Sequence, residues 1–111
     1  MTKATIGKYS LLRYLGVVVL LVSFSGCVTA SPPLEEYTLA DAAVKAAKAV
    51  QAVRYSPGHW HQAEESFRQA RILYQERDYE QAKDLFIKAR QSAEKAENSA
   101  RLLRQQNGDI L

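Results

Sequence analysis

Tyr55-Ser56-Pro57-Gly58-His59-Trp60 is the stretch that sets the order of helices in this chain. Serine is a preferred N-cap, and proline fits the first helical position, where its missing N–H costs nothing. The stretch therefore predicts that one helix ends near Arg54 and that the next begins at Pro57. Tyr55 and Trp60 occupy the two positions of a hydrophobic staple, so we expect Trp60 in the core.

Apolar residues recur at helical spacing on both sides of a second turn. The helix after Pro57 has one apolar face, formed by Trp60, Ala63, Phe67, Ala70 and Tyr74. Arg77-Asp78 predicts the turn, with Asp78 capping a third helix that ends at Gln105-Gln106-Asn107-Gly108. The stripe of this third helix runs through Tyr79, Ala82, Phe86, Ala89, Ala93, Ala96 and Ala100.

The segment before Ser56 predicts a first helix from Thr38 to about Arg54. Thr38-Leu39-Ala40-Asp41 has the pattern of a capping box. Its expected buried face consists of Leu39, Ala42, Ala43, Ala46, Val50 and Val53. We therefore expect an all-α fold, a three-helix antiparallel up-down-up bundle over residues 38–106 followed by a tail at 107–111. The candidate structural core is Trp60, Phe67, Ala70, Tyr79, Ala82, Phe86 and Ala89.

Residues 1–26 have the three parts of a secretory signal peptide. A basic head without acidic residues is followed by an uncharged, mostly apolar run at 14–24 and then by small residues. Ser25-Gly26-Cys27 resembles the lipobox of bacterial lipoproteins, and Cys27 is the only cysteine. The resemblance implies that residues 1–26 are removed and that the Cys27 thiol carries a diacylglycerol. Residues 27–37 would then be a flexible tether to the membrane.

Two other interpretations of this segment remain open. The uncharged run from Tyr14 to Leu34 has the length of a transmembrane helix, although it becomes polar after Phe24 and a span needs about 20 mostly apolar residues. The chain is alternatively an ordinary secreted protein with an incidental cysteine. A lone cysteine forms no internal disulfide, so lipidation accounts for Cys27 better.

The charge balance argues against nucleic-acid binding. Lys3, Lys8 and Arg13 precede Cys27, while the other 12 Lys and Arg and all 12 Asp and Glu follow it. The part after residue 26 thus has no net formal charge, and its basic residues alternate with acidic ones. The pI of the whole chain, about 9.1, is basic because of the three basic residues before Cys27, so it does not indicate a basic binding surface.

Residues 34–104 resemble the family called domain of unknown function 4398. The pattern is carried by Tyr55-Ser56-Pro57, Ala63-Glu64, Ala70-Arg71, Asp78-Tyr79, Ala82, Ala89 and Ala93. The resemblance implies a short, Ala-rich helical lipoprotein domain of the bacterial envelope, with no established activity. Members sometimes precede an OmpA-like peptidoglycan-binding module, which makes an OmpA-like protein the candidate partner here.

The second and third helices also resemble a tetratricopeptide hairpin. Ala70, Asp78-Tyr79, Ala82, Phe86 and Ala89 match the small and aromatic positions that let two helices approach closely. At least three such repeats are normally needed for a stable array. The resemblance therefore implies shared packing geometry and not a peptide-binding groove.

No motif for catalysis, a cofactor or a metal stands out. His59 and His61 are two residues apart on a helix and point away from each other, so together they are poor ligands for one ion.

We expect a non-enzymatic lipoprotein with a structural or adaptor role through protein–protein contacts, without a cofactor. In the lipoproteins that this segment resembles, Asp after the lipidated cysteine is the usual signal for retention in the inner membrane. The resemblance therefore implies, with Val28 at that position, the outer membrane with the domain facing the periplasm; the alternative is the periplasmic side of the inner membrane. The alternative function is a small-ligand or metal-binding module at His59, Trp60 and His61.

Overall fold

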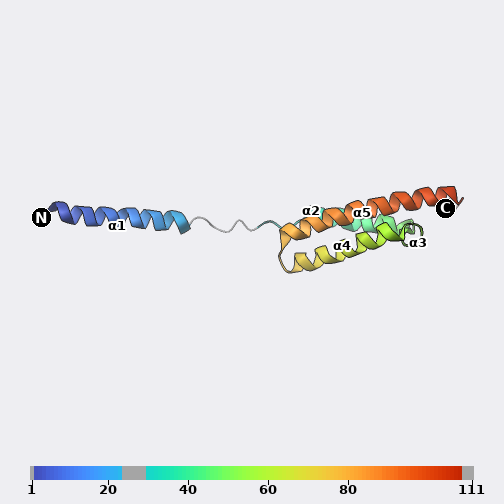
Figure 1. Ribbon diagram of the computed structural model, residues 1–111, viewed down its shortest axis with the longest axis horizontal. Helices are drawn as coiled ribbons and strands as arrows, with labels where there is room; N and C mark the ends of the chain where they lie inside the picture. The colour runs from blue at the N-terminus through green and yellow to red at the C-terminus, as the bar shows by residue number, and fades with distance from the viewer. Residues whose placement is uncertain (1, 24–29, 109–111) are drawn as a thin grey trace.

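The computed structural model describes residues 2–23 and 30–108, and all regular secondary structure in these ranges is helical (Figure 1). This confirms the predicted all-α class. The helices are α1 (Thr2–Ser23), α2 (Leu34–Ala49), α3 (Ala52–Tyr55), α4 (Pro57–Gln75) and α5 (Tyr79–Gln106).

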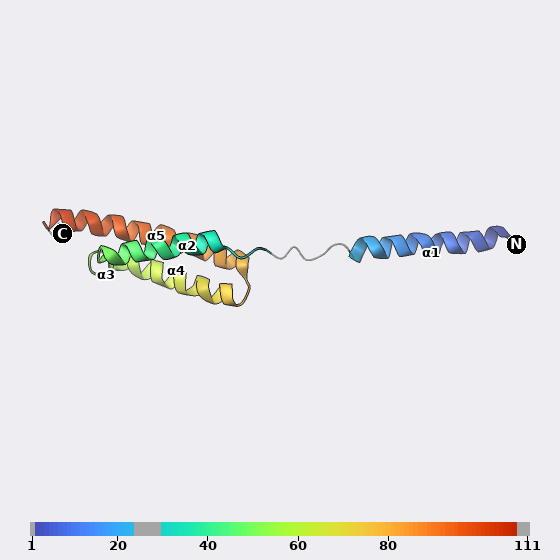
Figure 2. The same ribbon diagram turned by 180° about the vertical axis from the view of Figure 1, so that it is seen from behind.

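The four helices α2–α5 pack together, and α5 is the one that the others share. Both α4 and α2 contact it along much of their length, whereas α2 and α4 touch each other little. Figure 1 and Figure 2 show α4 returning alongside α5, with α2 running in the same direction as α5. The short α3 lies between α2 and α4 in the chain and packs against α5, an element that the sequence pattern did not predict.

Helix α1 stands apart from this bundle. No described residue of α1 lies against any of the other four helices. Its apolar side chains are accordingly exposed, with Leu15 at 62% and Leu21 at 66%. Within the described ranges, no helix combines the length and the apolar character that a membrane span needs.

The first helix of the bundle begins four residues earlier than predicted. Helix α2 begins at Leu34 after Pro33, and Thr38 lies inside it, its Oγ1 donating to the Glu35 carbonyl at 2.9 Å. The capping-box interpretation of Thr38 was therefore wrong. Pro33 precedes the first turn, whose first amides have no acceptor inside the helix, and the acidic residues there, Glu35 and Glu36, complement the helix dipole.

The predicted face of this helix was also wrong in part. Leu39 is 40% exposed and Val53 55% exposed, and Ala42 lies on the surface, whereas the fully buried residues of α2 are Ala40 and Ala47. The helix is interrupted at Gln51, whose φ of 60° is left-handed, so Val53 belongs to the separate α3. The packed face contains Tyr37, Ala40 and Ala47 together with Val50 of the predicted face, whereas Leu39 and Ala42 face outward.

The two turns around α4 follow the sequence signals. Ser56 is the N-cap of α4 and Pro57 its first residue, although the Ser56 side chain makes no capping hydrogen bond. After Gln75 the chain reverses at Arg77, which has a φ of 64°. The amide of Asp78 donates to the Leu73 carbonyl at 2.9 Å and that of Arg77 to Tyr74 at 3.2 Å, the pattern of a Schellman motif. Asp78 then caps α5, accepting from the Gln81 amide.

Two apolar clusters fill the bundle. One surrounds Trp60 and joins the C-terminal end of α2 and the N-terminal end of α4 to the second half of α5, with Ala93, Ala96 and Ala100 fully buried. The other surrounds Phe86 at the opposite end, near the turn between α4 and α5. Because alanines line most of α5, the helices approach closely, and the few aromatic rings fill the remaining volume.

Candidate functional site

The stretch from His59 to His61 begins α4, and the structure separates its three side chains. Trp60 is only 5% exposed and belongs to the core cluster, whereas His59 and His61 lie on the surface. In residues 2–23 and 30–108 no group of three or more His, Cys, Asp or Glu side chains is placed to hold a metal ion. The three residues predicted as an alternative ligand site therefore do not converge on one point.

His61 instead lines a groove between α2 and α4. Its apolar part consists of Val44 from α2 and Phe67 from α4, and its charged part comes entirely from α4. The charged residues on α4 are Glu64, Glu65, Arg68 and Arg71. The groove exists because α2 and α4 both pack on α5 more closely than on each other.

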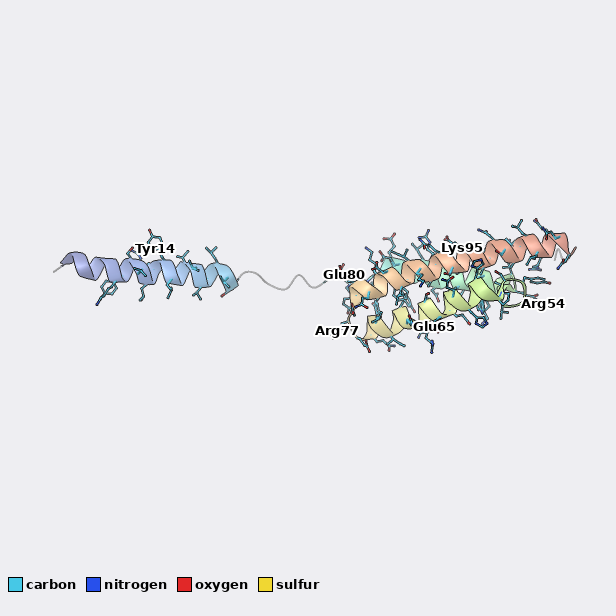
Figure 3. All side chains as sticks on the ribbon, in the orientation of Figure 1. Tyr14, Arg54, Glu65, Arg77, Glu80 and Lys95 are labelled. Carbon is cyan, nitrogen blue, oxygen red and sulfur yellow. The ribbon has the colours of Figure 1, made fainter. Side chains whose placement is uncertain are left out.

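The charges beside this groove largely neutralise one another. The Arg68 guanidinium pairs with Glu65, and Gln69 donates to the same carboxylate at 2.9 Å. Glu65 lies on the side of α4 that faces away from α5 (Figure 3). The hydrogen bond from Arg68 lowers the pKa of Glu65 below its ordinary value of 4.5, so this carboxylate is a poor proton donor at neutral pH. Such a groove can bind an apolar group and form hydrogen bonds with a ligand, and none of its lining residues is an activated nucleophile.

The seven predicted core residues fall into two classes of burial. Ala70, Ala82, Phe86 and Ala89 are fully buried, and Trp60 nearly so. Phe67 and Tyr79 are half-buried at the margin of the Phe86 cluster and near the turn. The ring centroids of Tyr79 and Tyr74 are 5.5 Å apart and the ring planes meet at 63°, so the two tyrosines that bracket the turn pack on each other.

Sequence reasoning missed Tyr37, which was assigned to the tether. The centroid of its ring lies 5.9 Å from the ring centroid of Phe67 and 6.1 Å from that of Tyr74. The signal that would have found it is the spacing of Tyr37, Ala40, Val44 and Ala47, which follows a helical repeat of three and four residues.

The remaining predicted site, Cys27, lies outside the described residues, as do Ser25, Gly26 and Val28. The described chain on its two sides is helical up to Ser23 and again from Leu34.

One comparison with known proteins gives a match. The model of the family described as domain of unknown function, DUF4398, matches residues 35–108. These residues contain α3, α4, α5 and all of α2 except Leu34, so the match coincides with the packed bundle. No curated protein and no solved structure matches the chain.

Proposed function

The chain belongs to the DUF4398 family, and from this premise we propose that it is a lipid-anchored protein of the bacterial cell envelope with a structural or adaptor role. In this proposal residues 1–26 direct export and are then removed. Cys27 carries the lipid, and the bundle acts through protein–protein contacts without catalysing a reaction.

The observation that carries the proposal is the independence of the bundle from α1. Both apolar clusters are built from residues between Tyr37 and Ala100, and they include no described residue of α1. The apolar side chains of α1 stay exposed, for example Val22 at 68% and Leu20 at 63%. A segment whose apolar residues pack on nothing in the domain can be cut off without opening its core, as removal of a signal peptide requires.

The position of the cysteine supports the lipid anchor. It follows the apolar helix after a few residues, with Ser25 and Gly26 directly before it, and it has no second cysteine with which to form a disulfide. With Val28 after Cys27, the proposed location is the inner leaflet of the outer membrane with the bundle in the periplasm. The inner membrane is the alternative location.

The adaptor role is proposed from the helical architecture of the bundle. We propose that α4 and α5 form a tetratricopeptide-like hairpin within an up-down-up bundle, supported by the buried small residues Ala70, Ala82 and Ala89 at close approach. The proposed partner of this bundle is an envelope protein, with an OmpA-like peptidoglycan-binding protein as the candidate. A pull-down of the acylated chain that recovers no envelope protein would count against this role.

Metabolic labelling with a palmitate analogue tests the anchor. The wild-type chain is expected to take up label and to fractionate with outer membranes. Cys27→Ala is expected to take up none and to accumulate at full length, because the thiol is the acyl acceptor and cleavage follows acylation. The proposal is wrong if the wild type stays unlabelled or if Cys27→Ala is labelled equally.

The alternative function is a ligand-binding module at the α2–α4 groove, which His61 lines. Titration calorimetry of the protein with divalent ions and with haem distinguishes it from the adaptor role. Submicromolar binding that is lost in His59→Ala/His61→Ala would favour the ligand module, whereas heats at the level of dilution would favour the adaptor.

A further inference from the structure

One end of the bundle, opposite the start of α2, is formed by α3 and the last turns of α5. On α3, Tyr55 packs against the Trp60 cluster, whereas Val53 and Arg54 are exposed. Figure 1 and Figure 2 both show α5 running on past α3, and Figure 3 shows Arg54 at this end. Ala100 is the last fully buried residue of α5, so the turns that follow lie largely outside the packed core.

Two large apolar side chains are uncovered at this end. Val53 is 55% exposed, and Leu103 in the last turns of α5 is 39% exposed. Leu103 and Arg104 follow the buried Ala100 by three and four residues, so both lie toward the side of α5 that packs on the bundle. Arg104 donates to the Val50 carbonyl at 3.5 Å, and α3, which begins two residues later, packs against α5. Val53 and Leu103 therefore belong to one surface, at the end where α3 meets α5.

The two ends of the bundle carry opposite charge. Residues 34–41 and 76–84, at the end where α2 begins, contain seven acidic and two basic residues. Among residues 50–59 and 97–108, at the other end, the Lys, Arg, Asp and Glu residues are Arg54, Arg101, Arg104 and Glu97. A partner that is attracted to this second end must therefore be acidic.

Two of these arginines are held in place and still have donors for a carboxylate. The guanidinium carbon of Arg54 lies 5.2 Å from the centroid of the Tyr55 ring. A guanidinium that stacks on a ring uses its face and keeps the N–H groups at its edge. Arg101 donates to Glu97 at 3.1 and 2.8 Å from two of the five N–H groups that a guanidinium carries.

We propose that this end binds an acidic segment of another protein, one in which carboxylates lie next to a large apolar side chain. The carboxylates pair with the arginines, and the apolar side chain packs on Val53 and Leu103. Arginine and tyrosine are the residues that most often dominate binding at protein–protein interfaces. The inference rests on the proposed adaptor role, to which it assigns a surface and a partner chemistry. We call this the distal surface, formed by Val53, Arg54, Tyr55, Arg101, Leu103 and Arg104.

Other anionic occupants fit the distal surface less well. Anionic membranes are bound by clusters of about four to eight basic residues, more than the three arginines present here. The acidic end of a second copy matches by charge. In the proposed location, however, both copies are held at the membrane by the end where α2 begins. The 28 residues of α5 span about 42 Å, so the acidic end of one copy does not reach the distal surface of its neighbour.

Selection from a library of short randomised peptides tests the partner chemistry, with the full-length chain in detergent as the bait. Peptides that also bind the Val53→Ser/Arg54→Glu double variant are removed, so binding to α1 does not contribute. We expect the remaining peptides to combine Asp or Glu with Leu, Ile or Phe. The affinity of the most enriched peptide, measured by fluorescence anisotropy, should fall as salt is added. Enrichment of no peptide, or only of basic or uncharged peptides, would overturn the proposal.

Single substitutions test the position of the surface with the same peptide. Arg54→Glu should weaken binding by roughly tenfold or more, because like charges are forced together. Val53→Ser should weaken it by roughly fivefold or more, because less apolar surface leaves water. The matched controls Lys95→Glu and Ile72→Ser, on exposed residues of α5 and α4, should bind like the wild type. Wild-type affinity in Arg54→Glu, or an equal loss in the controls, would contradict the assignment, and circular dichroism should show equal helix content in all variants.

A pull-down with the acylated chain distinguishes failure of this inference from failure of the adaptor role. Envelope proteins recovered equally by the wild type and by Arg54→Glu would overturn the distal surface and leave the adaptor role standing. Recovery of none by either chain would count against the role itself. Binding to vesicles of anionic lipid, or self-association in sedimentation equilibrium, that Arg54→Glu abolishes while no acidic peptide is enriched would assign the surface to those occupants and overturn the proposal.

Discussion

The ring of Tyr37 meets the ring of Phe86 edge-on, with the centroids 5.2 Å apart and the planes at 87°. Tyr37 is on α2 and Phe86, which is fully buried, is on α5. The Phe67 ring of α4 lies 5.8 Å from the same Phe86 ring. One aromatic contact group thus joins all three long helices of the bundle, and Tyr37 is the part of it that α2 supplies.

Tyr37→Ala should destabilise the bundle more than any substitution on the exposed side of α2. Loss of a half-buried ring from an aromatic cluster is expected to cost about 2–4 kcal/mol. Thermal unfolding followed by circular dichroism measures this, with Leu34→Ala as the control, since Leu34 is 61% exposed. Equal melting temperatures for the two variants would mean that Tyr37 does not hold α2 in place.

Trp60→Ala should lower the melting temperature sharply or unfold the bundle. Removing a buried large aromatic side chain costs about 3–5 kcal/mol, a large share of the total stability of about 5–15 kcal/mol usual for a domain. His59→Ala and His61→Ala should melt like the wild type, because both side chains are exposed. If Trp60→Ala kept its melting temperature and lost a ligand or partner, the ligand-binding alternative would become the better one.

Arg77→Gly should leave the turn between α4 and α5 intact and make it more stable. Arg77 has a φ of 64°, a conformation that glycine adopts without the steric cost of about 1–2 kcal/mol that other residues bear. Arg77→Val should do the reverse, since a β-branched side chain fits this conformation least well. Figure 3 shows Arg77 at the outside of this turn, so neither change opens the core. Chemical denaturation of the three proteins gives the order, and a valine variant as stable as the glycine variant would contradict it.

Acid should weaken the first turn of α2 and, to a smaller extent, the ion pair of Glu36 with Lys83 of α5. The pKa of Glu36 lies below its ordinary 4.5, first because its own backbone N–H donates to the carboxylate and further because of Lys83. The folded state therefore binds fewer protons than the unfolded state, so this contribution to stability is present above pH 4.5 and is lost as the pH falls through the lowered pKa. Unfolding measured from pH 6 down to pH 3 should show a shallower loss in Glu36→Gln; an unchanged slope would mean that Glu36 contributes nothing.

The helix-breaking and capping residues are what made much of the bundle predictable. Ser56-Pro57 and Asp78 act through local backbone chemistry, so their roles can be inferred from neighbouring residues alone, and α4 and α5 begin where these signals lie. The helical repeat of apolar residues on α5 is similarly unambiguous, because it persists from Tyr79 to Ala100, about six turns, with charged residues between.

Helix α2 could not be predicted as well, because alanine is a weak marker of burial. Ala40 and Ala42 look alike in the sequence, yet one is fully buried and the other exposed. The choice between the two faces is made by Tyr37 packing on rings from α4 and α5, contacts that are distant in sequence. The α2–α4 groove was missed for the same reason, since Val44 and Phe67 meet there only after both helices dock on α5.

The mass of the intact protein purified from membranes tests the lipid anchor most directly. The proposal predicts a chain that starts at Cys27 and is heavier than its amino acids by the mass of the attached acyl chains, with fragments that place the added mass on Cys27. A chain that retains residues 1–26, or one whose Cys27 carries no lipid, would contradict it.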